Sequence, residues 1–253
     1  MSEEWTDSEV VTRGMSAYHA ARLELARGVA LHGYAKPWAI NVNSGPIVDE
    51  YQRAAHILSG RSAWALPQGS APWCGSFVAY CYRKAGFDME GALAGRLNLD
   101  GKTPSQKYLV FWSAIRINHY LTRHEGARRL AFPSVRAAAR KEDCIAWLKD
   151  NLHPFGPLPG DVLLFHTVSD LSHVGMVASY DPETFELVTY EGNYQRRVVA
   201  ARWNLATPGA VGLGRLNVIG RFPSSDFGAS PEVAFDTDSP APTSEDGVYV
   251  PGR

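Results

Sequence analysis

The segment 157-PLPGDVLLFHTVSDLSHVGMVASY-180 is where the chain changes from helical to β-rich patterning. A Gly-Asp turn at 160–161 is followed by a short apolar run, and a second such run starts at His173. Short apolar runs between turn residues are typical of strands. Three more β-rich runs follow at short spacing, in residues 185–194, 196–205 and 214–222. Together the five runs predict a meandering antiparallel sheet.

Upstream of this segment, apolar residues recur at the spacing of helices. The pattern predicts helices over 8–32, 46–58 and 73–85, the last with Gly86 as its C-terminal cap. A helical insertion is predicted over 87–156, with helical patterns at 103–125 and 134–152. Helices followed by strands indicate an α+β fold, in which the N-terminal helices pack against a C-terminal antiparallel sheet.

The chain is expected to form a single domain followed by a tail. Residues 1–222 make up the domain, and residues 1–64 contribute its N-terminal helices. Residues 223–253 are rich in Pro, Ser, Asp and Gly and carry six acidic side chains and one Arg. That composition predicts a disordered acidic tail. The alternative is an extended arm that docks through its few apolar residues.

Composition and charge argue against several classes of protein. The 253 residues are 45% apolar, which is enough to bury a sizeable core. A formal net charge of −1, without a large cluster of Lys and Arg, argues against nucleic-acid binding. No apolar stretch approaches the roughly 18 residues of a membrane span. The acidic N-terminal segment lacks the features of a signal peptide, so we expect synthesis in the cytoplasm.

The three cysteines fit neither a disulfide framework nor a metal site. Cys74 and Cys81 are seven residues apart, about 10 Å along a helix, which is too far for a disulfide. No CxxC or HExxH pattern occurs, so we expect neither a metal nor a cofactor. Cys74 stands at the predicted start of a helix, where free N–H groups and the helix dipole favour a thiolate. At this point Cys74 can be read as a nucleophile or as a buried structural residue.

A nucleophilic thiol also needs a base and a group that orients that base. His173 starts a predicted strand, and its ring can project from the sheet toward a helix packed on it. His166, at the end of the preceding strand, is the competing candidate. Glu191 and Asn193 close the next strand, where an antiparallel neighbour could contact the second nitrogen of His173.

Four segments resemble the CHAP and NlpC/P60 superfamily of papain-like cysteine peptidases and amidases. The nucleophile segment of that family is similar to PWCGSFVAYCYRKAG, and its base segment is similar to PGDVLLF followed by SHVGMVAS. The E-x-N of CHAP domains is similar to YEGN, and the last strand of many members is similar to GRLNVIGRF. The resemblance covers about residues 65–222 and keeps the order Cys, His, Glu, Asn.

The resemblance implies a role for each matching residue. It implies Cys74 as the nucleophile, His173 as base and acid, and Glu191 as the orienting group. Asn193 would be a supporting polar residue. Gln68 lies six residues before Cys74, the spacing at which papain-like enzymes place an oxyanion glutamine. The alternative for Gln68 is an ordinary loop residue.

Substrate contacts are expected from aromatic residues beside these motifs, namely Trp73, Trp112 and Tyr194. The resemblance implies a cysteine amidohydrolase or endopeptidase that cleaves amide bonds of peptidoglycan peptides. Without a signal peptide, delivery by a secretion system or by phage lysis is expected, and an injected effector would have an immunity protein as partner. Two alternatives are an intracellular papain-like protein peptidase or deamidase and a non-catalytic CHAP-like binding module.

Overall fold

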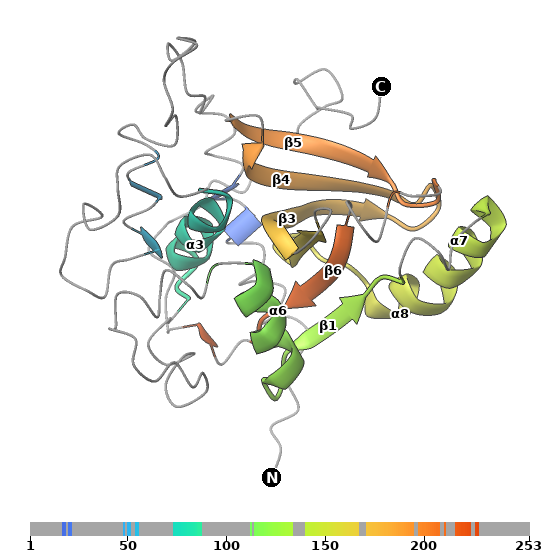
Figure 1. Cartoon of the computed structure of the whole chain (residues 1–253), viewed down its shortest axis with the longest axis horizontal. Coiled ribbons are helices and arrows are strands. Elements are labelled where there is room, and N and C mark those ends of the chain that lie inside the picture. Colours follow the sequence, from blue (N-terminus) through green and yellow to red (C-terminus); the bar gives the residue numbers. More distant parts are fainter. Residues whose placement is uncertain are drawn as a thin grey trace.

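The described part of the computed structural model forms an α+β fold around a six-stranded antiparallel sheet (Figure 1). It covers residues 17–18, 20–21, 48, 50–51, 54–55, 73–87, 112, 114–133, 140–166, 171–194, 197–207, 210, 216–223 and 226–227. Its helices are α3 (Cys74–Lys84), α6 (Ala114–Arg123), α7 (Lys141–Trp147), the π-helical turn η4 (Leu148–Leu152) and α8 (His153–Phe155). Its strands are β1 (Arg128–Ala131), β2 (Val162–His166), β3 (Leu171–Asp181), β4 (Glu186–Tyr194), β5 (Arg197–Asn204) and β6 (Leu216–Arg221).

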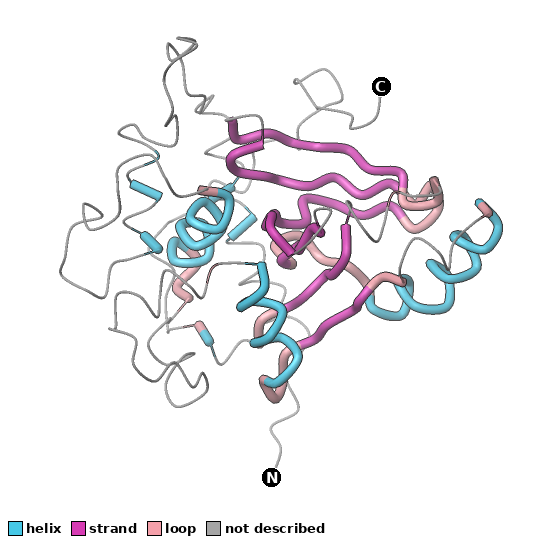
Figure 2. The backbone as a smooth tube through the Cα atoms, in the orientation of Figure 1, coloured by secondary structure: helices cyan, strands magenta, loops and turns pink. Residues whose placement is uncertain are grey.

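The five predicted β-rich runs are confirmed as β2 to β6, but the sheet is not a simple meander. Its strand order is β1-β6-β2-β3-β4-β5, and all pairings are antiparallel. Figure 2 shows the strands in magenta at the centre of the described part. The strands β2 to β5 follow one another as predicted, whereas β6 crosses over to pair with β2 on the far side. This crossover places the first predicted run at the centre of the sheet, where β2 pairs on both sides.

The prediction that the insertion over 87–156 is helical is wrong for residues 128–131. These residues form the strand β1, which pairs with β6. Its sequence, RRLA, is short and mostly exposed, so it carries little of the apolar alternation by which strands are recognised. The helix expected at 103–125 is observed as α6 over 114–123, and residues 103–111 lie outside the described part. The helix expected at 134–152 is observed from Lys141 onward, and residues 134–139 are likewise outside it.

Strand alternation gives the sheet two apolar faces, and helices cover both. Val162, Val174 and Met176 face the core beneath α3 and α6, while Leu163 and Leu187 face the core beneath η4 and α8. In Figure 1, α3 lies to the left of β3 and β4, and α7 lies to their right. The sheet therefore forms the middle layer of the domain.

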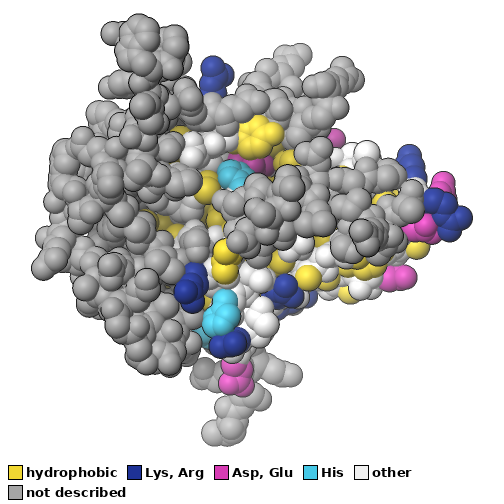
Figure 3. All heavy atoms as spheres, viewed as in Figure 1, with side chains coloured by type: hydrophobic (Ala, Val, Ile, Leu, Met, Phe, Trp, Pro, Cys, Tyr) yellow, Lys and Arg dark blue, Asp and Glu magenta, His cyan; other side chains and the backbone are white. Residues whose placement is uncertain are grey.

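The helix α6 is amphipathic. Its buried residues, Ala114, Ile117, Tyr120 and Leu121, recur at helical spacing and face the sheet. Its outer side carries Arg116, His119 and Arg123. Figure 3 shows basic and histidine side chains gathered over α6 and β1. This part of the surface is therefore cationic, although the chain as a whole carries a net charge of −1.

The N-terminal helices predicted at 8–32 and 46–58 are described at a few positions only, and these are helical. Ala17, Ala21, Val48 and Tyr51 are buried in the core shared with α3. Tyr18 stacks on Tyr190 of β4, with ring centroids 5.6 Å apart. The described N-terminal residues thus pack against the same core as the sheet.

The predicted tail begins at Pro223, but the packed part continues past that residue. Asp226 is buried and accepts a hydrogen bond from the Tyr120 hydroxyl. Phe227 forms an isolated antiparallel bridge with Phe87 and packs against the core. The rest of the stretch predicted as a tail, residues 224–225 and 228–253, lies outside the described part.

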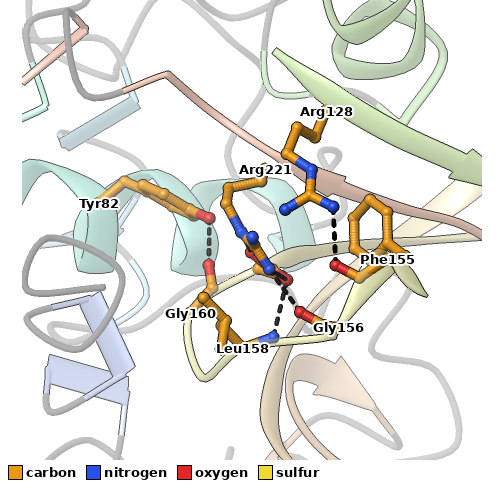
Figure 4. A network of polar contacts seen from close by, with 8 residues as sticks. Tyr82, Arg128, Phe155, Gly156, Leu158, Gly160 and Arg221 are labelled. Atoms are coloured by element: carbon orange, nitrogen blue, oxygen red, sulfur yellow. Dashed lines mark hydrogen bonds and ion pairs between the residues drawn. The ribbon is translucent and has the colours of Figure 1, made fainter. Parts of the chain in front are cut away.

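A buried polar network joins α3 to the sheet (Figure 4). The Tyr82 hydroxyl of α3 donates to the carbonyl oxygen of Gly160, and the Gly160 N–H donates to Val177 of β3 at 2.8 Å. Gly160 has φ +91°, a conformation that favours glycine. Arg221 of β6 binds both carboxylate oxygens of Asp161, each at 2.7 Å. The Pro-Gly-Asp turn thereby fixes the helix of Cys74 against the strand of His173.

Candidate active site

Cys74 is the first residue of α3, as the sequence predicts, and it is only 6% exposed. The first hydrogen bond of the helix runs from the Phe77 N–H to the Trp73 carbonyl at 2.9 Å. The N–H groups before Phe77 therefore have no acceptor within the helix. No acidic residue occupies this first turn, so the positive end of the helix dipole acts on the thiol undiminished.

The surroundings of Cys74 favour its ionised form. Burial by itself raises the pKa of the thiol, but a hydrogen bond with the His173 ring and the charge of that ring lower it. The backbone groups of Val174 and Gly75 also hydrogen-bond the thiol and lower the pKa further. The net result is a pKa below the ordinary value of a cysteine. Cys74 is thus held as a thiolate more readily than a free thiol would be.

His173 lies near the start of β3, directly opposite Phe165 of β2. The two rings are in contact, with centroids 5.3 Å apart. Phe165 belongs to the core beneath η4, and strand alternation places His173 on the same side of the sheet, at this end of β3. The ring reaches the thiol of Cys74, the first residue of α3, so it meets the helix that the sequence predicts to pack on the sheet.

Glu191 of β4 holds the second nitrogen of that ring. His173 Nε2 and Glu191 Oε2 are 2.8 Å apart, and the glutamate is fully buried. Burial lowers the pKa of His173, whereas Cys74 and Glu191 raise it by hydrogen bonding and by charge, to about 10. The lowered pKa of Cys74 and the raised pKa of His173 together favour the thiolate–imidazolium form of this pair. Because Nε2 binds Glu191, Nδ1 is the nitrogen left for the thiol.

Gly175 makes room for this carboxylate. It stands opposite Glu191 in the register of β3 and β4. A Cβ at Gly175 would lie 3.0 Å from Glu191 Cγ and 3.3 Å from the Phe165 ring. With any larger residue in the HVG segment, the Glu191 side chain and its neighbours would have to shift by a few tenths of an ångström.

Thr189 and Trp203 extend the series, and neither residue was predicted from the sequence. The Thr189 hydroxyl lies 2.6 Å from Glu191 Oε1, so both oxygens of the buried carboxylate have a partner. Trp203 Nε1 of β5 donates to the Thr189 hydroxyl at 3.2 Å. Strand alternation could have placed Thr189 beside Glu191, since the two are two residues apart. The contact with Trp203 depends on the pairing of β4 with β5.

Asn193 and Tyr194 lie where β4 leaves regular pairing with β5. Asn193 has φ +59°, a left-handed conformation that asparagine tolerates better than most residues, and the register shifts between Glu191 and Tyr194. The Tyr194 ring approaches His173 edge-on, with centroids 6.2 Å apart. Gly192 packs so closely on Phe77 of α3 that a Cβ would overlap it. Of the expected substrate contacts, Tyr194 is thus the one placed beside the histidine.

The two tryptophans that we expected to contact substrate are both buried. Trp73 has no exposed surface, and its ring lies 5.8 Å from that of Tyr51. Trp112 is 3% exposed and packs among aromatic rings of the core. Its carbonyl group lies against the first turn of α3, where a Cβ at Gly75 would overlap it. Both tryptophans support the helix of Cys74 from within the core.

The other sequence candidates lie at the limits of the described part. Gln68 lies outside it, as does the side chain of His166. The backbone of His166 ends β2 opposite Leu171. Among the described residues, no group of three His, Cys, Asp or Glu side chains is arranged to hold a metal ion.

Comparison of the chain with protein-family models, with curated proteins and with solved structures found no match. The helices in the described part of the chain are all too short or too polar to span a membrane. The function of the site is therefore inferred from the chemistry of its residues. A thiolate, an imidazolium and a carboxylate in hydrogen-bonded series are the groups that nucleophilic acyl transfer requires.

Proposed function

We propose that this chain is a papain-like cysteine amidohydrolase of the CHAP type that cleaves amide bonds in peptidoglycan peptides. The observation that carries the proposal is the series Cys74, His173 and Glu191, with the helix start at one end and a buried carboxylate at the other. The peptidoglycan substrate follows from the resemblance of the motifs and not from the geometry.

The first half of the proposed reaction forms an acyl-enzyme. The Cys74 thiolate attacks the carbonyl carbon of the scissile amide, and a C–S bond forms as the carbonyl oxygen takes up negative charge. The backbone N–H groups at the start of α3 are suited to stabilise that oxyanion. The tetrahedral intermediate then collapses, the C–N bond breaks, and the His173 imidazolium gives its proton to the leaving amine.

The second half hydrolyses the acyl-enzyme. Neutral His173 takes a proton from water, whose oxygen attacks the thioester carbon. The C–S bond breaks, and the acid product leaves. The Cys74 thiolate and the His173 imidazolium are thereby restored. Throughout both steps Glu191 stabilises the charged ring and keeps Nδ1 directed at the sulfur.

The proposal is tested by digesting purified peptidoglycan sacculi and analysing the soluble muropeptides. The parent chain should release cleaved peptides, and Cys74→Ala should release none. The matched control is Cys144→Ala, which removes a buried thiol of α7 outside the site. An unchanged muropeptide profile with the parent chain would exclude the cell-wall assignment. Loss of cleavage in Cys144→Ala at an unchanged melting temperature would contradict the role given to Cys74.

A further inference from the structure

We infer that Thr189 and Trp203 are positioning residues that hold the Glu191 side chain directed at His173. The inference rests on the proposed function, because it concerns how the same site maintains its thiolate. Thr189 lies on β4 beside Glu191, and Trp203 lies on the neighbouring strand β5. Thr189 has no exposed surface and Trp203 very little, so neither is placed to touch substrate.

The direction of the Thr189 hydrogen bonds follows from the chemistry of the three groups. An indole N–H can only donate, so Trp203 Nε1, at 3.2 Å, uses a lone pair of the Thr189 oxygen. The hydroxyl proton then has two acceptors within reach, Glu191 Oε1 at 2.6 Å and the Ala201 carbonyl at 3.4 Å. A distance of 2.6 Å is that of a hydroxyl bound to a charged oxygen. The proton therefore points at the carboxylate.

This hydrogen bond matters because Glu191 is fully buried. One of its oxygens binds His173, and without Thr189 the other would lose its hydroxyl donor. A buried carboxylate that lacks donors is costly to keep charged. Thr189 thus supplies a donor to the buried carboxyl group, whose hydrogen bond and charge raise the pKa of His173.

Trp203 also supports the histidine by a second route. The Phe165 ring lies between the two residues, with its centroid 5.5 Å from that of Trp203 and 5.3 Å from that of His173. The Trp203 indole therefore contacts both Thr189, which binds Glu191, and Phe165, which packs on His173. Its N–H orients the hydroxyl that binds the carboxylate, and its ring packs on the ring that packs on the imidazole. Trp203 on β5 thus supports both His173 and Glu191, each through one intervening side chain.

The test measures the thiolate directly and so does not need the substrate. Iodoacetamide labelling of Cys74 is followed by peptide mass spectrometry at a series of pH values. Thr189→Val keeps the shape of the side chain and removes the hydroxyl, so the labelling midpoint should rise by about one pH unit. Thr189→Ser restores the hydroxyl and should return the midpoint to the parent value. A matched control is Thr184→Val, which removes an exposed hydroxyl bound to Asp181.

Each outcome decides the inference. A folded Thr189→Val protein with the parent midpoint would overturn it, as would a Thr189→Ser midpoint displaced as far as that of Thr189→Val. If Thr189→Val fails to fold, Trp203→Phe carries the test. It removes the N–H donor, and its midpoint should rise by less than one pH unit, whereas an unchanged midpoint would contradict the inference.

The sacculus digest separates this inference from the proposed function. If both hold, Thr189→Val should reduce muropeptide release about tenfold, the loss expected for a hydrogen bond to a charged group. If the parent chain leaves sacculi intact but the labelling midpoints shift as expected, the cell-wall assignment fails and the positioning role stands. If Cys74 of the parent chain labels like an ordinary thiol, both fail.

Discussion

The His173 imidazole and the Glu191 carboxylate meet across two neighbouring strands, with Nε2 and Oε2 2.8 Å apart. Their contact follows from the register of β3 and β4. Glu191 stands opposite Gly175, which is two residues after His173, so the two side chains are diagonal neighbours on one face. Both groups are therefore held by paired strands and not by loops. A substitution that changes only the charge of one group should leave the backbone where it is.

Glu191→Gln should lower the activity on muropeptides on the order of 100-fold or more. The amide matches the carboxylate in size but carries no charge, so it cannot stabilise the imidazolium. The pKa of His173 should then fall from about 10 toward its ordinary value. A rate assay and an NMR titration of the His173 ring measure the two effects.

The matched control for that substitution is Glu186→Gln on the same strand. Glu186 is partly exposed and pairs with Arg202 of β5, at the other end of β4 from the site. Activity and the His173 titration should both stay at the parent values. An equal loss in the two variants would show that Glu191 acts through the strand and not through its charge.

The rate at which iodoacetamide labels Cys74 should reach its plateau at a lower pH than for an ordinary thiol. The thiolate is the reactive form, and the pKa of Cys74 lies below its usual value, so labelling falls off only when the pH drops through that lowered pKa. His173→Gln removes the hydrogen bond and the positive charge, so its labelling midpoint should move to higher pH. The opposite sign, a midpoint that falls in His173→Gln, would exclude the ion pair.

Local sequence signals predict much of the candidate site. The helix start at Cys74 can be predicted from the Pro and Trp before it and from the spacing of apolar residues after it. These signals are local, since they lie within one or two helical turns of Cys74. The strands that carry His173 and Glu191 are readable from short apolar runs between turns. Their adjacency is also predictable, since consecutive strands joined by a short turn pair with each other.

Features that depend on the pairing and register of strands cannot be predicted from such local signals. The strand β1 pairs through its backbone with β6, about 90 residues away by the register of Arg128 with Arg221, and its side chains give no strand signal. The same crossover of β6 brings Arg221 to Asp161. Trp203 reaches Thr189 only when the register of β4 and β5 is known.

Breaking the buried ion pair between Asp161 and Arg221 should destabilise the fold. Arg221→Met leaves the Asp161 carboxylate buried without its two guanidinium donors, which costs about 3–5 kcal/mol of unfolding free energy. Urea unfolding measures the loss. The control is Asp143→Asn in the exposed pair with Arg140, which should leave the unfolding midpoint unchanged. A parent-like midpoint for Arg221→Met would mean that Asp161 finds other donors or is protonated.

Gly175→Ala should disturb the site more than the fold. The new Cβ would lie 3.0 Å from Glu191 Cγ, so the carboxylate must move away from His173 or the two strands must separate slightly. Either shift weakens the hydrogen bond to Nε2, and the midpoint for labelling of Cys74 should rise.

The comparison variant is Gly220→Ala on β6, where a Cβ would overlap the end of the Leu121 side chain of α6. Overpacking there should lower the melting temperature while the labelling midpoint stays at the parent value. If both alanine variants lose stability equally and neither shifts the midpoint, then Gly175 serves only the packing of the sheet, and Glu191 tolerates the displacement.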